Sequence, residues 1–339
     1  MDTAERERSG LRLPLSVLDL VPIAEGSTGS EAMRNSLELA RLAEELGYTR
    51  YWFAEHHGMA SIASSAPEIL IARTAAATSH IRVGSGGIML QNHVPLKAAE
   101  AFHTLEALFP GRIDLGIGRA PGTDPRTSQA LRPFDPEHFP QHLGELIGLS
   151  RGTLPLEHPF HGVRVIPSEV PLPPIWMLGS SGGSARLAGE LGLGYSFARH
   201  FSPAPAQPAI ATYRAAFRPS ENFPRPHVIL GIAVVCAETD ERADYLATSM
   251  DLMWARVHRG EFRPIPSPEV ASTYPYTPQD RVVVDRYRQL VFVGSPTTVR
   301  RRIEAAVEEA GADEVIVTST IFDHADRLES YRLLAGAFS

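Results

Sequence analysis

The amino-acid sequence predicts an α/β fold, a (β/α)8 TIM barrel with insertions after strand 4 and strand 7. Three observations support this prediction. Short apolar runs alternate with helical patterns along the 339 residues, and eight such runs can be counted. Strands that alternate with helices are typical of a parallel sheet closed into a barrel. Two long irregular stretches, at 119–172 and 259–280, interrupt the alternation.

The predicted strands are short, apolar and bounded by glycine, proline or polar residues. They cover residues 13–20, 49–55, 81–90, 112–118, 173–180, 193–198, 228–237 and 313–320. Helices are expected between them, at 31–46, 67–78, 95–109, 137–149, 182–192, 204–217, 239–257 and 296–310. The last helix is the best delimited, because Ser295 suits the cap, Pro296 the first turn and Gly311 the exit.

An open, doubly wound sheet is the alternative architecture. Its fingerprint is a GxGxxG turn after the first strand, whereas residues 13–20 lead into VPIAEGSTGS. We therefore expect residues 1–339 to form one barrel domain. Long insertions in a barrel are typical of lids or binding loops. For residues 259–280, which hold five prolines and no helical period, disorder is an equal alternative.

Composition excludes several classes of protein. The net charge is −7 with both signs interspersed, so no basic stripe for nucleic acid is present. The single cysteine, Cys236, excludes a disulfide framework and fits a reducing compartment. Residues 1–10 are charged and lack the apolar core of a secretory signal. No apolar stretch approaches the roughly 18 residues of a membrane span. We expect a soluble, cytoplasmic protein.

Candidate site residues stand at the C-terminal ends of the predicted strands, where barrels carry their active sites. His56 and His57 follow strand two, and they should point to opposite faces because side chains alternate along a strand. A shared metal ion is therefore not expected, and no metal site is predicted. His103 lies mid-helix and is interpreted as a surface or packing residue. No GxSxG elbow is present, and Glu55 is the only acid at these strand ends, which disfavours hydrolase chemistry.

Two glycine-rich segments indicate a ligand. LGSSGGSA (178–185) places small and hydroxyl residues at a helix start, where free backbone N–H groups attract an anion. Arg119, after strand four, would complete a phosphate-sized site, although simple helix capping is the alternative. VGSGGIM (83–89) holds three glycines, which allow either a flat ligand or a barrel-corner bulge. A neutral base, an amide, an arginine and a phosphate cradle suit a phosphorylated organic cofactor.

These segments resemble the bacterial luciferase-like flavin-dependent monooxygenases. FAEHHG (53–58), GSGGIMLQNHVP (84–95), GRIDLGIGRAPGTD (111–124) and LGSSGGSA follow one another in the family's order. The resemblance covers nearly the whole chain and is closest to the single-component, homodimeric branch. It implies a (β/α)8 barrel and FMN that a separate NAD(P)H:flavin reductase supplies in reduced form. Oxygen and a small organic substrate would be the other reactants.

The resemblance also implies roles for individual residues. His56 matches the active-site histidine, and the bond between Gly86 and Gly87 matches a non-prolyl cis peptide under the flavin ring. Ser85 would border that ring, and Asn92 would hydrogen-bond its pyrimidine edge. The residues expected at the phosphate are Arg119, Ser180, Ser181, Gly182 and Ser184.

Two positions depart from luciferase itself. Gly118 stands where luciferase carries a reactive cysteine, and a histidine before the proline occurs one place early, as His93. Both departures put aldehyde-oxidising luminescence in doubt. We therefore expect an FMN-dependent monooxygenase or oxidoreductase with His56 as general base or hydrogen-bond partner. The alternatives are a deazaflavin-dependent hydride-transfer enzyme and a non-catalytic flavin-binding protein.

Overall fold

The computed structural model describes residues 13–131 and 136–339. The charged residues 1–10, which we interpreted as lacking a secretory signal, lie outside the described residues, as do residues 132–135 of the first insertion.

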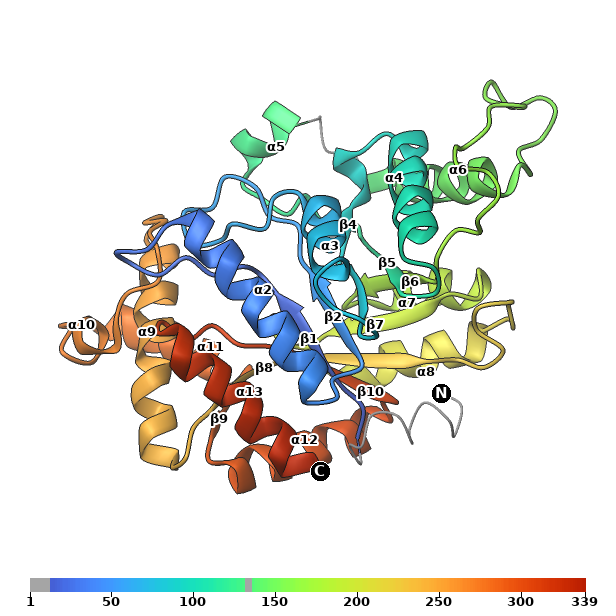
Figure 1. Cartoon of the computed structure of the whole chain (residues 1–339). Coiled ribbons are helices and arrows are strands. Elements are labelled where there is room, and N and C mark those ends of the chain that lie inside the picture. The colour runs from blue at the N-terminus through green and yellow to red at the C-terminus, as the bar shows by residue number, and fades with distance from the viewer. Residues whose placement is uncertain (1–12, 132–135) are drawn as a thin grey trace.

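Parallel strands form a closed barrel at the centre of the molecule (Figure 1). Around the barrel the order is β1, β2, β3, β5, β6, β7, β8 and β10, and β10 pairs again with β1. The predicted (β/α)8 fold is therefore confirmed. The strands are β1 (Leu15–Asp19), β2 (Arg50–Phe53), β3 (Arg82–Ser85), β4 (Ile88–Met89), β5 (Ile113–Gly118), β6 (Ile175–Gly179), β7 (Gly194–Ala198), β8 (Val228–Cys236), β9 (Val291–Gly294) and β10 (Glu314–Thr318).

Helices pack around the barrel through their apolar faces. In the first of them, Leu39, Leu42 and Ala43 are buried, and a capping box between Thr28 and Glu31 fixes the start. The helices are α2 (Gly29–Glu45), α3 (Pro67–Ala75), α4 (Pro95–Leu108), α5 (Pro125–Leu131), α6 (Phe139–Arg151), α7 (Gly182–Glu190), α8 (Ala206–Ala216), α9 (Asp240–His258), α10 (Pro268–Ser272), α11 (Pro278–Arg288), α12 (Pro296–Ala310) and α13 (His324–Phe338), with 3₁₀ turns at Leu90–Asn92 and Pro136–His138.

The third predicted strand is not continuous. Residues 81–90 divide into β3 and β4, which both pair with β5. The break falls at Gly86–Gly87, whose peptide bond is cis, as the family resemblance implies. A Cβ added to Gly87 would lie 2.7 Å from the carbonyl carbon of Gly116 on β5, so only glycine fits against that backbone.

The second insertion lies after the seventh predicted strand, as expected, and it is ordered rather than disordered. Residues 259–280 contain α10 and the start of α11, each beginning at a proline that suits the first helical turn. β9 follows and pairs with the end of β8, a strand that the prediction missed. The insertion is also tied to the barrel, because the Ile265 amide donates to the Ile23 carbonyl and the Ile265 carbonyl accepts from the Glu25 amide.

Side chains inside the barrel form layers along its axis. Arg50, Asp114 and Glu314 lie at the N-terminal ends of their strands and are almost completely buried. Above them an apolar cluster that includes Leu18, Trp52, Ala54, Trp176 and Ile229 fills the interior. At the C-terminal ends the inward positions hold small residues, which are Ala54, Gly86, Gly118, Ala198 and Gly231. The barrel interior is therefore filled by large side chains below, and only small residues line its C-terminal end.

Candidate active site

His56 lies at the C-terminal mouth of the barrel. It continues the inward-facing series of Trp52 and Ala54 on β2, as strand alternation predicts. Its Nδ1 lies 3.1 Å from the carbonyl oxygen of Gly122. Because a carbonyl only accepts, Nδ1 carries the hydrogen and Nε2 keeps its lone pair. Burial lowers the pKa of His56, so the imidazole is neutral near pH 7 and able to accept a proton.

His57 points elsewhere, to the buried carboxylate of Glu55. Its Nε2 lies 2.8 Å from Glu55 Oε1, and the Nε2 of His93 lies 2.9 Å from Oε2. The amide of Met89 and the side chain of Asn92 also donate to this carboxylate, at 2.8 and 3.1 Å. Burial alone would raise the pKa of Glu55, but the hydrogen bonds from His57 and His93 outweigh it and lower the pKa to about 2. An ionised Glu55 therefore joins the segments after β2 and β4.

Asn92 has less freedom to bind a ligand than the sequence prediction assumes. Its Nδ2 donates to Glu55 and to the carbonyl of Pro121, both at 3.1 Å. These bonds use both amide hydrogens, so only Oδ1 remains for a bound molecule. Ser85 is similar: it is fully buried, and its Oγ donates to the Gly116 carbonyl at 2.8 Å. Its contact with a ligand would be through the backbone.

The expected phosphate residues lie together at the ends of β5 and β6, which are neighbours in the barrel. α7 begins here with Ser181 at its N-cap, and no side chain caps its first backbone N–H groups. Ser184 Oγ donates to the Ser181 carbonyl at 2.9 Å. A Cβ added to Gly182 or Gly183 would meet nothing within 4 Å, so other parts of the protein do not crowd these two residues. Such a helix start attracts anions.

Arg119 follows β5 and is exposed. It forms no ion pair with any of the described residues, which leaves its guanidinium available to an anionic ligand. Ser180, at the end of β6, is half-buried. The structure thus brings the predicted anion-binding groups to one side of the barrel mouth.

One histidine at the mouth was missed by the sequence prediction. His200 comes two residues after β7, in the inward-facing register of Ser196 and Ala198. In the barrel order β7 lies opposite β2, so His200 faces His56 across the mouth. The sequence did carry a signal for this residue, because His200 follows the sixth predicted strand (193–198), and the ends of only the earlier strands were considered.

A buried backbone outlier also lies at the mouth. Val21, two residues after β1, has φ 54° although it is β-branched and fully buried. Its amide donates to Asp19 Oδ1 at 2.8 Å, which helps to hold this conformation. Such outliers cluster at functional sites.

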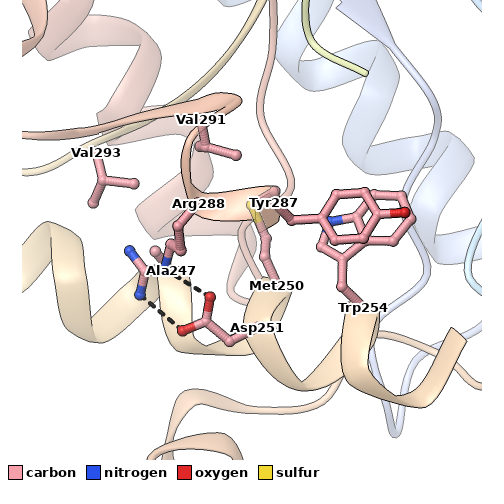
Figure 2. Close-up of a pocket in the computed structure, with 8 residues that line it drawn as sticks. All are labelled: Ala247, Met250, Asp251, Trp254, Tyr287, Arg288, Val291 and Val293. Atoms are coloured by element: carbon pink, nitrogen blue, oxygen red, sulfur yellow. Dashed lines mark hydrogen bonds and ion pairs between the residues drawn. The ribbon is translucent and has the colours of Figure 1, made fainter. Parts of the chain in front are cut away.

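Two hollows occur away from these residues. One lies between α9, α11 and β9, where Trp254 stacks on Tyr287 and Asp251 pairs with Arg288 (Figure 2). Its space of about 10 Å³ holds at most one water molecule, so it is no ligand site. The other is a cavity of about 320 Å³ beyond the C-terminal ends of β1 and β10, bordered by Pro22, Ala24 and Phe322.

Residues 13–131 and 136–339 contain no cluster of three or more His, Cys, Asp or Glu that is arranged to hold a metal ion. Within the same ranges, no helix combines the length and apolarity that a bilayer crossing needs.

Comparison with known proteins gives the family. The sequence model of the luciferase-like monooxygenases matches residues 14–314. Protein YvbT of Bacillus subtilis (strain 168) is 46% identical over 95% of both chains. A luciferase-like monooxygenase of Escherichia coli (strain K12) is 43% identical, over 95% of this chain and 96% of the relative. An N-acetyl-S-alkylcysteine monooxygenase of B. subtilis (strain 168) is 33% identical, over 95% and 97%.

Solved structures agree. Apo-MsnO8 is 41% identical with a TM-score of 0.86, and the match covers 96% of this chain and 98% of MsnO8. The oxygenating constituent of 3,6-diketocamphane monooxygenase in complex with FMN shares the fold at 20% identity, with a TM-score of 0.71 over 96% and 97%. An F420-dependent secondary alcohol dehydrogenase shares it at 14% identity, with a TM-score of 0.67 over 96% and 99%. The chain therefore belongs to the luciferase-like monooxygenase family.

Proposed function

We propose that this protein is an FMN-dependent monooxygenase that oxidises a small organic substrate with reduced FMN and molecular oxygen. The carrying observation is that an open anion site and a neutral imidazole share one barrel mouth. The relative that is named a monooxygenase of N-acetyl-S-alkylcysteine supports the reaction type. The fold relative that was solved with FMN supports the cofactor.

The FMN phosphate would bind at the start of α7. The hydroxyls of Ser181 and Ser184 and the backbone N–H groups of Gly182 and its neighbour would hold it, and Arg119 would neutralise its charge. Ser180 borders this position. The residues fit the group, because these N–H groups have no capping side chain and other parts of the protein do not crowd the two glycines.

The flavin ring would lie along the backbone of Ser85, Gly86 and Gly87, with Asn92 Oδ1 at its pyrimidine edge. Bound reduced FMN would supply the electrons that activate oxygen. His56 would accept or return a proton at Nε2, because Gly122 holds its Nδ1 hydrogen. Residues 259–280 would exclude water from the mouth, since Ile265 ties them to the loop after β1.

The assembly that we propose around this site follows from the same family. A separate NAD(P)H:flavin reductase would deliver reduced FMN, and the chain would act in the cytoplasm as a homodimer.

The proposed function is tested by absorbance titration of the protein with FMN and with F420, each reduced, while oxygen uptake is recorded. We expect reduced FMN to bind and oxygen uptake to depend on an added substrate from a panel of aldehydes, ketones and polyketide-like compounds. Substrate-dependent F420 oxidation without oxygen uptake would instead identify the hydride-transfer alternative, which the F420-dependent fold relative favours. FMN binding without any substrate-dependent turnover would identify a non-catalytic flavin carrier.

A further inference from the structure

One nitrogen of the His200 imidazole, Nδ1, is buried beside the Gly231 backbone and has no side chain to bind among the described residues. The ring packs over Gly231 of β8, where an added Cβ would lie 2.8 Å from Nδ1. Phe201 contacts it edge-to-face, with ring centroids 4.8 Å apart. Buried polar groups in native proteins are normally paired, so an unpaired imidazole at a barrel mouth points to a ligand.

The imidazole of His200 carries no charge. Burial lowers the pKa of His200 to about 4, although the Gly231 backbone beside the ring raises it, and His56 across the mouth makes a smaller lowering contribution. A neutral imidazole can form one hydrogen bond with a neutral oxygen, whereas a carboxylate at this buried position would lose its hydration without gaining a counter-charge.

The order of the strands divides the mouth into two halves. The proposed FMN position runs from β3, which carries Gly86, to β6, which precedes Ser181, and these strands flank β5. The other half is bordered by β7, β8, β10 and β1. His200 stands at the edge of this second half, and the missing side chain of Gly231 makes room for its ring.

A cavity lies beside the second half, although His200 is not among its lining residues. The cavity of about 320 Å³ lies beyond the ends of β1 and β10, and its volume is in the range of small-molecule sites. Arg327, which borders the cavity, is already paired with Asp19 at 2.7 Å. Asp323 borders the same cavity and disfavours anions, while Glu25 beside it is paired with Arg256 at 2.7 Å.

We propose, resting on the FMN site above, that His200 is a substrate-contacting residue that hydrogen-bonds an uncharged oxygen, and that it selects neutral ketones, aldehydes or alcohols over carboxylates of similar length. His56 and His200 would then approach the substrate from opposite sides, one toward the cofactor and one toward the polar group that orients the substrate.

The first test compares His200→Phe, which keeps an aromatic ring, with His200→Asn, which keeps a hydrogen-bonding group. The exposed His258→Ala is the control. With the best neutral substrate, His200→Phe should raise KM about tenfold, the effect of one lost hydrogen bond, while kcat changes less. His200→Asn should recover part of the loss. The dissociation constant for FMN, from flavin fluorescence, should stay within about twofold. An unchanged KM, or FMN binding weakened as much as substrate binding, would overturn the proposal.

The second test does not depend on FMN. Imidazole ¹⁵N resonances of the full-length protein are recorded during titration with 2-octanone and, separately, with octanoate, and the His200 signal is assigned from the Phe variant. We expect 2-octanone to shift the His200 resonance and octanoate to leave it unchanged. Equal shifts with both probes, or none with either, would refute the selection of neutral oxygen groups even if FMN binding is confirmed. Failure of FMN to bind would remove the proposed function, while this titration would still decide the role of His200.

Discussion

The two ends of the barrel interior differ in whether their polar groups have partners within the protein. At the N-terminal end, Arg50 binds Glu314 at 2.7 Å and Asp114 at 2.8 Å, and Arg82 binds Asp114 at 2.6 Å. Two arginines and two carboxylates therefore balance one another. At the C-terminal end, His200 has an unpaired nitrogen, and Arg119 has no ion-pair partner among the described residues.

This difference separates structural from functional polarity. A buried charge is tolerated only when it is paired, and every charge of the N-terminal cluster has a partner within the protein. Polar groups at the mouth that lack a partner within the protein would find one in a bound molecule. Burial alone would not distinguish the two ends, since both hold buried titratable groups. The two ends differ in whether these groups have hydrogen-bond or ion-pair partners within the protein.

The largest effect is expected from breaking the N-terminal cluster. Arg50→Met would leave Asp114 and Glu314 with fewer counter-charges in the barrel interior. We expect the free energy of unfolding to fall by about 3–5 kcal/mol, the usual cost of removing one partner of a buried pair. Urea denaturation measures this. Arg332→Met, which removes an exposed pair with Glu329, is the matched control and should cost no more than about 1 kcal/mol. Equal losses in both variants would contradict the contrast between the ends.

At the mouth, His56→Ala should affect turnover and leave stability nearly unchanged. Removing a general base typically slows a reaction by about 10²- to 10⁴-fold. Substrate-dependent oxygen uptake with reduced FMN measures the rate, and urea denaturation measures stability. The FMN dissociation constant should be nearly unchanged. If turnover is unchanged, His56 is not the general base of the reaction.

The pH dependence of stability should distinguish the ends. The folded pKa of Glu314 is about 2 because the charge of Arg50 overcomes burial, so its stabilising contribution is complete above pH 4.5 and is lost as the pH falls toward 2. The folded pKa of His200 is about 4, below its usual 6.5. The unfolded chain therefore binds a proton at this histidine first, and the free energy of unfolding falls as the pH drops from 6.5 toward 4.

We therefore expect His200→Phe to flatten the stability curve between pH 6.5 and 4, and Glu314→Gln to flatten it between pH 4.5 and 2. Urea denaturation across this range measures both slopes. If both variants changed the same pH interval, the two clusters would not titrate independently.

The smallest effect is expected from Arg119→Ala. Loss of one exposed cation from a phosphate site should weaken FMN binding about tenfold, and the free energy of unfolding should not change, because Arg119 pairs with nothing that the structure describes. Flavin fluorescence measures the binding. Arg126→Ala, at the start of α5 and exposed, is the control. Equal binding by both variants would exclude Arg119 from the phosphate site.

The sequence was informative where the reasoning needed only local periodicity. Alternation along β2 separated His56 from His57, and the apolar runs located the eight barrel strands. The role of Glu55 could not be predicted, because three of its four partners lie in a segment that meets it only in the folded chain. These partners are Met89, Asn92 and His93. β9 was missed although its four residues, VFVG, are a short apolar run that ends at Gly294.

The pairing of Ile265 with the loop after β1 has a consequence for exchange kinetics. The Ile23 amide donates to Ser61, whereas the Glu25 amide donates to Ile265 and the Ile265 amide donates to Ile23. If the insertion lifts away, the amides of Glu25 and Ile265 lose their acceptors while the Ile23 amide keeps its own. Deuterium uptake at the amides of Glu25 and Ile265 would thus report how often the mouth opens. The Ile23 amide is the internal reference, because its exchange does not depend on this motion.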